Sequence, residues 1–242
     1  MYVRCAACPL RVRPAFVQKS DEEVALIEAW KSDHLRLPAG AEFIRPEQTD
    51  AELFTLFSGW AFRYKELIDG RRQILNFALP GDLIGLQSSM FGKSLYGAVA
   101  LTDIELCLLP RRKLGNLFER YPELGYEVTW LGARSESLVD ENLLSAGRRG
   151  AAERIAALVA GLYKRAETLG LVEDGALELP LTQQHIADAL GLSLVHTNKT
   201  LARLRAQKLF SISEGRLVVH NLRGVSRFAQ HFEDDLAPRP MI

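Results

Sequence analysis

The residues best suited to chemistry in this chain of 242 residues are its three cysteines. Cys5 and Cys8 stand in the run "CAAC" near the start, and Cys107 lies in the apolar run "IELCLLP". Two thiolates at Cys-x-x-Cys spacing serve zinc, iron–sulfur clusters and dithiol chemistry equally well. Cysteine is also a small apolar residue that packs without reacting. The spacing alone therefore leaves metal binding, redox chemistry and inert packing open.

A second group of residues is typical of DNA recognition. In "LTQQHIADALGLSLVHTNKTLARLR", Thr182 caps one short helix, and Gly191 makes the turn into a second helix. Such a pair is a helix-turn-helix, whose second helix enters the major groove. On that helix, which runs from about Ser193 to Ala206, we expect an inner face of Leu194, Thr197, Leu201 and Leu204. We predict DNA contacts by Ser193, Val195, His196, Asn198, Lys199 and Arg203.

The stretch that follows supports this interpretation. "LFSISEGRLVVHN" predicts a β-hairpin with Glu214 and Gly215 at its turn, which would be the wing of a winged helix and carries Arg216 as a further DNA contact. Between Ser193 and Arg227 there are seven basic residues and one acid, although the whole chain has a formal net charge of +0. A local basic excess is the footprint of phosphate contact, so we predict double-stranded DNA as a partner.

The composition excludes several other classes of protein. Hydrophobic residues make up 48% of the chain and charged residues 25%, which suits a globular protein with a real core. We find no transmembrane run, no secretory signal and too few cysteines for an extracellular disulfide framework, so we expect a cytoplasmic protein without a membrane partner. Phosphate-binding glycine loops, His-Glu-x-x-His motifs and nucleophile elbows are missing, so we predict that the protein is not an enzyme.

The elements that must position these residues fall into two halves. A short helix is expected within 17–33, and from 34 to 110 short apolar runs are cut by Gly or Pro at intervals typical of an antiparallel sandwich or barrel. Pro122 then opens a long helix that reaches about Ala146. The break "SAGRRG" at 145–150 marks a domain boundary, and the tail 231–242 is expected to be loosely held.

A barrel, a long helix and a winged helix in this order resemble the CRP/FNR family of bacterial transcription regulators. The resemblance covers almost the whole chain, and its strongest pieces are "PGDLIGL", "GRRGAAERIAALVAGL" and the helix-turn-helix stretch quoted above. It implies an α+β fold made of a cyclic-nucleotide-binding-type β-barrel (jelly roll), a long dimerisation helix and a C-terminal winged helix-turn-helix. The corresponding domains are 1–120 (sensory, with the Cys-x-x-Cys segment), 121–147 and 148–242. It also implies a homodimer on palindromic promoter sites and RNA polymerase as a partner.

Within this resemblance, the sequence argues against cyclic AMP as the signal. In the cyclic-nucleotide branch, a Glu and an Arg after the Gly-Asp motif hold the ribose and the phosphate. Here Leu86 stands where the Glu is expected, and "SLYG" at 94–97 offers no Arg. Lys93 could reach a phosphate but is alone, and a buried phosphate without a bidentate guanidinium is poorly compensated.

The cysteines instead resemble those of the oxygen-sensing FNR branch, whose members hold a [4Fe–4S] cluster. Cys5 and Cys8 match part of the N-terminal cysteine group, and Cys107 matches the distant cysteine on a late barrel strand. The next cysteine of the group would fall near Pro14, where none exists, and a cluster usually has four cysteine ligands. The resemblance therefore implies redox sensing by a cluster on Cys5, Cys8 and Cys107 with an unknown fourth ligand.

Several alternatives stay open at this point. The three cysteines could serve thiol/disulfide chemistry or zinc, or be inert in a regulator that answers to another small effector. The winged helix could make protein contacts only, in a small-molecule-binding module. Many family members carry Glu-x-x-Ser-Arg on the recognition helix, where this chain has Val195, Asn198 and Lys199, so the half-site sequence of the family does not carry over.

Overall fold

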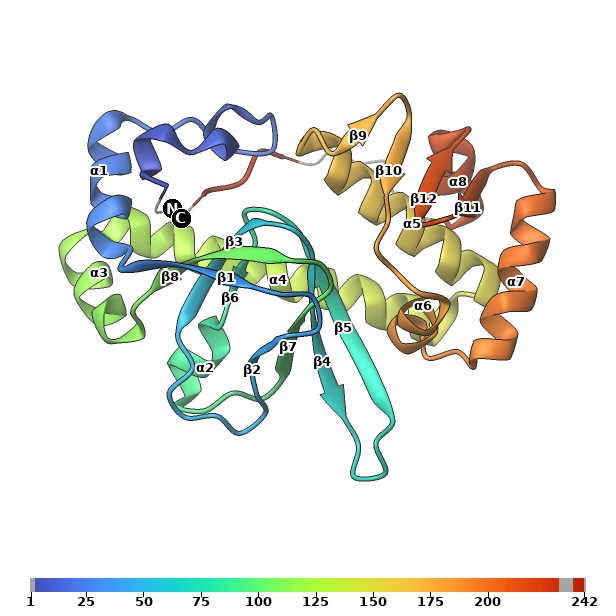
Figure 1. Cartoon of the computed structure of the whole chain (residues 1–242), viewed down its shortest axis with the longest axis horizontal. Coiled ribbons are helices and arrows are strands. Elements are labelled where there is room, and N and C mark those ends of the chain that lie inside the picture. The colour runs from blue at the N-terminus through green and yellow to red at the C-terminus, as the bar shows by residue number, and fades with distance from the viewer. Residues whose placement is uncertain (1–2, 231–236, 242) are drawn as a thin grey trace. The chain divides into compact units, whose positions relative to one another are not determined.

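The computed structural model describes residues 3–230 and 237–241 (Figure 1). The chain divides into two compact units. The first contains Met1–Lys65, Phe77–Ser137 and Pro238–Ile242, and the second contains Glu66–Asn76 and Leu138–Ala237. The α+β fold predicted from the sequence is confirmed, with two antiparallel sheets, a long helix and a C-terminal winged helix-turn-helix.

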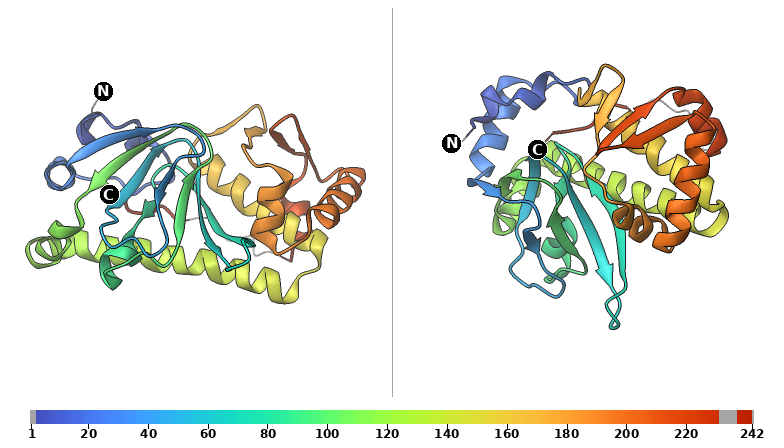
Figure 2. Two further views of the ribbon diagram at one scale, coloured as in Figure 1. Left: turned by 60° about the horizontal axis from the view of Figure 1, so that its bottom comes forward. Right: turned by 45° about the vertical axis from the view of Figure 1, so that its right-hand side comes forward.

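Two four-stranded antiparallel sheets form the jelly-roll-like part of the fold. Their strand orders are β1-β8-β3-β6 and β2-β7-β4-β5. The strands are β1 (Asp33–Leu37), β2 (Glu42–Ile44), β3 (Leu53–Ser58), β4 (Ala61–Glu66), β5 (Arg72–Ala78), β6 (Leu83–Ile84), β7 (Gly97–Ala100) and β8 (Ile104–Leu109). A hairpin with Asp69 and Gly70 at its turn joins β4 to β5, and Figure 2 shows that this hairpin extends beyond the neighbouring strands. The strand interiors are apolar on the side that faces the other sheet, so their burial holds the two sheets together.

Helices close one end of these sheets. They are α1 (Asp21–Trp30), α2 (Leu86–Phe91), α3 (Leu114–Arg120) and the long α4 (Pro122–Arg148), with 3-10 turns at Cys5–Ala7, Pro9–Val12 and Arg111–Lys113. Ser20 and Glu23 form a capping box that satisfies the first amides of α1. Ile27 and Trp30 of α1 pack with Leu117 of α3 and Val128 of α4 in one apolar cluster.

The second unit carries the helix-turn-helix. Its elements are α5 (Ala151–Thr168), β9 (Val172–Glu173), β10 (Ala176–Glu178), α6 (Gln183–Leu190), α7 (Leu194–Ala206), β11 (Phe210–Ser213), β12 (Arg216–Val219) and α8 (Leu222–Phe228). The predicted wing is the β11–β12 hairpin, and it belongs to a sheet of order β11-β12-β10-β9. Sequence analysis did not identify the β9–β10 hairpin, although Asp174 and Gly175 at its turn have the positive φ angles such a turn requires.

The end of the chain differs from the sequence-based expectation. Residues 231–236 lie outside the described part, but Arg239 and Pro240 are buried rather than loosely held. Arg239 forms a parallel β-bridge with Phe16, so the two ends of the chain run together in the first unit (Figure 1). Isolated apolar and charged letters at a C-terminus carry no signal for such a contact, which depends on the distant partner.

The turn Pro80-Gly81-Asp82 depends on a glycine at its centre. Gly81 has a φ of 85°, and a Cβ atom there would lie 2.2 Å from Cζ of Phe16. Gly92, at the end of α2, has a similar φ of 76°, but a Cβ atom there would meet nothing within 4 Å. Substitution of Gly81 and of Gly92 therefore separates the free-energy cost of a left-handed backbone from that of a steric clash.

We expect Gly81→Ala to destabilise the chain more than Gly92→Ala. Both changes cost about 1 kcal/mol because an L-residue disfavours the left-handed region. Gly81→Ala adds about 2 kcal/mol, because the new methyl group must displace the buried Phe16 ring. Urea unfolding of both variants measures the difference in the free energy of unfolding. Equal losses would show that Phe16 does not pack on this turn.

Candidate nucleic-acid interface and cysteine cavity

The three cysteines, which are far apart in the sequence, line one cavity in the first unit. Its volume is about 40 Å³. Besides Cys5, Cys8 and Cys107, the lining consists of Leu10, Arg11, Lys19, Val24, Ile27, Lys31, Thr55, Phe57, Leu109 and Met241. The structure thus brings together the sulfur atoms that sequence analysis grouped only by resemblance, and it adds a lysine and a methionine to them.

The N-terminal segment that carries two of these cysteines is held by polar contacts to α1 and to the residues that follow it. The amide of Cys5 donates to Oε2 of Glu28 over 3.0 Å, and Arg4 forms an ion pair with the same carboxylate. Nζ of Lys31 donates to the carbonyl oxygen of Val3 over 2.9 Å. These contacts fix the short 3-10 turns over the sheet, so the position of Cys5 depends on α1.

Cys107 reaches the cavity from β8, the second strand of the sheet. It is opposite His34 of β1 and Thr55 of β3, so the three side chains share one face. The side chain of Lys31 donates a hydrogen bond to Cys107, which places a cation beside the thiol. Lys31 is only 7% exposed, so its charge is held among the thiols by Cys107 and the carbonyl of Val3.

Burial decides the protonation state of all three thiols. Burial raises the pKa of Cys5 from 9.0 to about 11, against the opposing effect of Lys31. Burial also raises the pKa of Cys8 and of Cys107, again more than the neighbouring cations lower it. At neutral pH the cavity therefore holds thiols rather than thiolates, and its cysteines are slow nucleophiles in this conformation.

The cavity does not supply the ligand set of a four-ligand cluster. Among residues 3–230 and 237–241, no three His, Cys, Asp or Glu side chains stand together in a metal-binding arrangement. His34 lies opposite Cys107, but its Nδ1 accepts the amide of Val3 and its Nε2 lies 3.2 Å from Glu105. Burial lowers the pKa of His34, in keeping with a neutral ring that accepts this amide. The donor set is therefore three protonated thiols with no fourth ligand among the described residues.

The expected nucleotide contacts are absent from their positions in the barrel. Leu86, which stands where the Glu is expected, packs against the apolar cluster of α1, α3 and α4. Lys93 forms an exposed ion pair with Glu47, 2.5 Å apart. These two positions therefore contribute packing and a surface pair rather than contacts to a ribose or a phosphate.

In the second unit, α7 presents the side chains that sequence analysis assigned to DNA. Ser193 caps the helix by accepting the amide of His196 over 3.2 Å, and Thr182 caps α6 in the same way. Thr197 and Leu204 are fully buried, as expected. All seven predicted contact residues are exposed: Ser193, Val195, His196, Asn198, Lys199, Arg203 and Arg216.

The predicted inner face of α7 is wrong at one residue. Leu194 is 40% exposed rather than buried, because it occupies the first position of the helix, ahead of the turns that pack on α5 and α6. Thr200 takes an inner position instead, with 3% exposure and its hydroxyl bonded to the carbonyl of His196 over 2.8 Å. The bond to the backbone satisfies the threonine hydroxyl inside the core.

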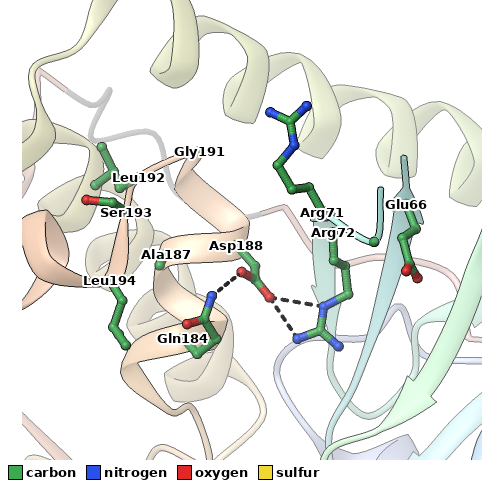
Figure 3. Close-up of a pocket in the computed structure, with 11 residues that line it drawn as sticks. Glu66, Arg71, Arg72, Gln184, Ala187, Asp188, Gly191, Leu192, Ser193 and Leu194 are labelled. Atoms are coloured by element: carbon green, nitrogen blue, oxygen red, sulfur yellow. Dashed lines mark hydrogen bonds and ion pairs between the residues drawn. The ribbon is translucent and has the colours of Figure 1, made fainter. Parts of the chain in front are cut away.

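The second unit also contains a cavity, which lies where the tip of the β4–β5 hairpin meets α6. Its volume is about 590 Å³, and Figure 3 shows Arg72 directed at Asp188, with both guanidinium contacts at 2.7 and 3.0 Å. Gln73 adds a bond to the carbonyl of Ala189 over 2.9 Å. Sequence analysis did not identify this contact, because it joins residues more than a hundred positions apart and neither has a distinctive motif.

No helix in the described ranges has the length and apolarity that a membrane crossing requires.

Comparison with known proteins supports the assignment of both units. Residues 34–121 match the family model "Cyclic nucleotide-binding domain", and residues 153–228 match "Crp-like helix-turn-helix domain". The chain is 33% identical to the transcriptional activatory protein AadR of Rhodopseudomonas palustris over 75% of this chain and 74% of that protein. It is 27% identical to the transcriptional activator protein FnrL of Cereibacter sphaeroides over 96% and 91% of the two chains. The solved structure of FixK2 from Bradyrhizobium japonicum is similar with a TM-score of 0.74 and 25% identity, covering 81% of this chain and 96% of that one.

We expect Cys5 to react slowly with iodoacetamide at neutral pH. The alkylation rate should keep rising with pH until about pH 11. The raised pKa lowers the thiolate fraction near neutral pH about 100-fold relative to an ordinary thiol. The same shift means that the buried neutral thiol contributes stability below pH 9, and this contribution is lost as the pH rises from 9.0 to about 11. Mass spectrometry of the Cys5 peptide after timed alkylation measures the rate.

The urea-unfolded chain is the control, because its thiols titrate without burial. A rate profile of the folded chain that coincides with the unfolded one would show that Cys5 is not buried in solution.

Proposed function

The chain belongs to the CRP/FNR family of DNA-binding transcription regulators, and from this premise we propose that it binds palindromic promoter sites as a homodimer whose affinity responds to the redox state of Cys5, Cys8 and Cys107. The family regulates transcription, and the chain is not an enzyme. The observation that carries the proposal is the exposure of every predicted contact residue of α7 and the wing, in a basic stretch of an otherwise neutral chain.

The chemistry of α7 suits recognition of base edges. Asn198 can pair bidentately with adenine, and Lys199 can donate to guanine. Both lie one turn after the capped start of the helix, which is the part that meets the bases in a helix-turn-helix. Arg203 lies further along the helix and suits a phosphate, and Arg216 of the wing adds a second phosphate contact. Arg216 pairs with Glu178 at the exposed surface, 3.0 Å away, so a phosphate can take the place of this carboxylate.

The exposed face of α4 supports dimerisation. Seven of its exposed residues follow the three-and-four spacing of a coiled-coil seam: Tyr126, Thr129, Ala133, Glu136, Asp140, Leu143 and Gly147. Tyr126 and Leu143 are 72% and 69% exposed, which is unusual for large apolar side chains on one helix face. A second copy would cover both. Glu136 and Asp140 would repel their counterparts across the seam, so the dimer is expected to be moderate in strength and sensitive to small changes of helix position.

Thiol chemistry is the sensing mechanism that best fits the cavity. Three cysteines converge there, but a cluster lacks its fourth ligand among the described residues, so no step of the proposal depends on one. Two thiols that form a disulfide release two protons and two electrons, and a hydroperoxide that accepts them becomes an alcohol and water. Cys107 is fixed on β8, whereas Cys5 and Cys8 lie on short turns, so a bond between the two groups would move the N-terminal segment.

Two further parts of the proposal follow from the family. The proposal includes no cyclic-nucleotide effector, because Leu86 and the Arg-free stretch 94–97 stand where the family's Glu and Arg would hold one. RNA polymerase is the partner that a promoter-bound regulator of this kind contacts, and the cytoplasm is where it would meet DNA in a bacterium.

Two sets of variants are expected to separate base recognition from dimerisation. Asn198→Ala and Lys199→Ala should each weaken binding to a palindrome selected from random DNA by about tenfold, because each removes one base contact. Leu143→Asp should lower affinity because it adds a third carboxylate to the seam and disfavours the dimer. Fluorescence anisotropy at several salt concentrations and sedimentation analysis measure the two effects.

Arg45→Ala serves as the control, because Arg45 is exposed and belongs to the first unit. It should leave both DNA affinity and oligomeric state unchanged. Binding that does not depend on salt, or no binding at all, would instead favour a winged helix that contacts proteins only.

Anaerobic purification tests the sensing mechanism. We expect a colourless protein with three titratable thiols, of which two are lost on treatment with a hydroperoxide, together with a change in DNA affinity. Cys107→Ser should abolish that change, because it removes the thiol held by the barrel. Cys5→Ser and Cys8→Ser then identify the partner thiol.

The opposite result is equally clear. A broad absorption band near about 400 nm with bound iron and sulfide, lost in Cys5→Ser and Cys107→Ser, would overturn the thiol mechanism and establish a cluster.

A further inference from the structure

We propose that the C-terminal segment of the chain, residues 238–241, is a lid that docks on the first unit and closes the cysteine cavity, so that docking of this segment and modification of the thiols oppose each other. The consequence for DNA binding rests on the proposed function. The lid itself rests only on contacts within the first unit.

The backbone of the segment is paired with the N-terminal part of the chain. The amide of Val17 donates to the carbonyl oxygen of Arg239 over 2.9 Å, and the amide of Arg239 donates to the carbonyl oxygen of Ala15 over 2.9 Å. These two bonds make the parallel bridge between Arg239 and Phe16. The amide and the carbonyl of Arg239 are thus both satisfied by the stretch Ala15–Val17, as expected for a segment that is docked rather than free in solvent.

The side chain of Arg239 anchors the segment in the turn at 80–82. Its Nη1 pairs with Oδ1 of Asp82, and its Nη2 donates to the carbonyl oxygen of Pro80 over 2.8 Å. The guanidinium lies over the ring of Phe16, 5.1 Å from its centre. Arg239 is 3% exposed, and the other oxygen of Asp82 is held by the amide of Leu79. A buried arginine with this set of partners is bound in one position, because breaking one contact leaves a buried charge uncompensated.

Two residues beyond this anchor, Met241 lines the cavity with Cys5, Cys8 and Cys107. The residues that pair with the segment, Ala15–Val17, come shortly after the 3-10 turns at Cys5–Ala7 and Pro9–Val12. The N-terminal stretch 5–17 therefore carries two of the cysteines at its start and binds the C-terminal segment at its end. A flexible thioether suits the end of a lid, because it fills an irregular gap without a polar group to satisfy.

The small volume of the cavity links docking of the lid to modification of the thiols. The three cysteines are partly exposed, and a space of about 40 Å³ among them holds no added carboxamidomethyl group unless that group extends into solvent or a lining residue moves away. Met241 is partly exposed at the end of the segment, beyond the arginine anchor, so it is the lining residue that we expect to move. If modification favours an undocked lid, then undocking favours modification to the same extent, since the coupling of two equilibria is reciprocal.

The lid also has a covalent connection to the DNA-binding half. A short run of chain joins the end of α8 at Phe228 to Arg239. Docking of Arg239 therefore fixes the end of the run of chain that leads to α8, and release of the lid frees that end. In the regulator we propose, the state of the thiols would reach the DNA-binding helices through this connection.

Alkylation rates in the purified full chain test the lid directly. Arg239→Ala, Met241→Ala and a chain that ends before Pro238 should each react with iodoacetamide at Cys8 or Cys107 at least about tenfold faster than the wild-type chain, because local opening no longer limits access. Arg45→Ala is the matched control and should react at the wild-type rate. Circular dichroism establishes that each variant is folded, and Met241→Ala, which leaves the arginine anchor intact, covers the case in which Arg239→Ala unfolds.

Hydrogen exchange provides the reciprocal measurement. In the alkylated wild-type chain, the amides of Val17 and Arg239 should exchange faster, while the amide of Gly40, which bonds to the carbonyl of Ala100 elsewhere in the barrel, should not change. Wild-type alkylation rates in folded Met241→Ala and in the shortened chain would overturn the proposal. So would unchanged exchange at Val17 and Arg239 after alkylation.

DNA-binding measurements distinguish a failure of the lid proposal from a failure of the proposed function. The shortened chain should bind DNA equally well with reduced and with oxidised thiols, whereas the wild-type chain should distinguish them. If alkylation confirms the lid but the wild-type chain binds DNA equally in both states, the coupling to DNA binding is overturned together with the redox part of the proposed function, and the lid stands.

Discussion

The buried pair of Arg239 and Asp82 is the contact on which the arrangement of the first unit's surface depends. Asp82 ends the tight turn that Gly81 permits, and that turn brings Phe16 against the guanidinium. Phe16 comes shortly after the 3-10 turns at Cys5–Ala7 and Pro9–Val12, and Cys5 and Cys8 line one cavity with Cys107. A single ionic contact thus joins the turn of the barrel, the N-terminal segment and the C-terminal segment, which are separate in the sequence. The cost of taking these charges out of water is offset by the carbonyl of Pro80 and the amide of Leu79.

The chemistry of the cysteines follows from their burial more than from their spacing. In water, two thiols beside a lysine would be expected to ionise readily, because the ammonium favours the thiolate. Here the loss of solvent outweighs the effect of Lys31, and the pKa of all three thiols rises. The thiols of such a site react slowly while the site is closed and faster once it opens. Control of access therefore governs the reactivity of these thiols as much as the identity of the neighbouring residues does.

The DNA-binding half depends on local rules, and sequence analysis predicted it closely. Thr182 and Ser193 act as helix caps because a hydroxyl there satisfies an otherwise unpaired amide, which is a property of a few neighbouring residues. Glu214 and Gly215 adopt the positive φ angles that the hairpin of the wing needs. The single error on α7, Leu194, arose because helical periodicity does not show that a first-turn residue lies outside the packed face. Thr200 was missed for the complementary reason, since its bond to a carbonyl of its own helix hides its polarity.

The sequence by itself determined the order of the elements, the α+β fold, the helix-turn-helix with its exposed face, and the candidate cysteines, because propensities, caps, turns and hydrophobic periods act over a few residues. It left the C-terminal segment as a loose tail. Only the tertiary structure decided that Arg239 pairs with Asp82, that Met241 and Lys31 join the cysteines, and that His34 is engaged elsewhere. These contacts join residues that are distant in the chain, and their energy comes from burial, which no local pattern of letters records.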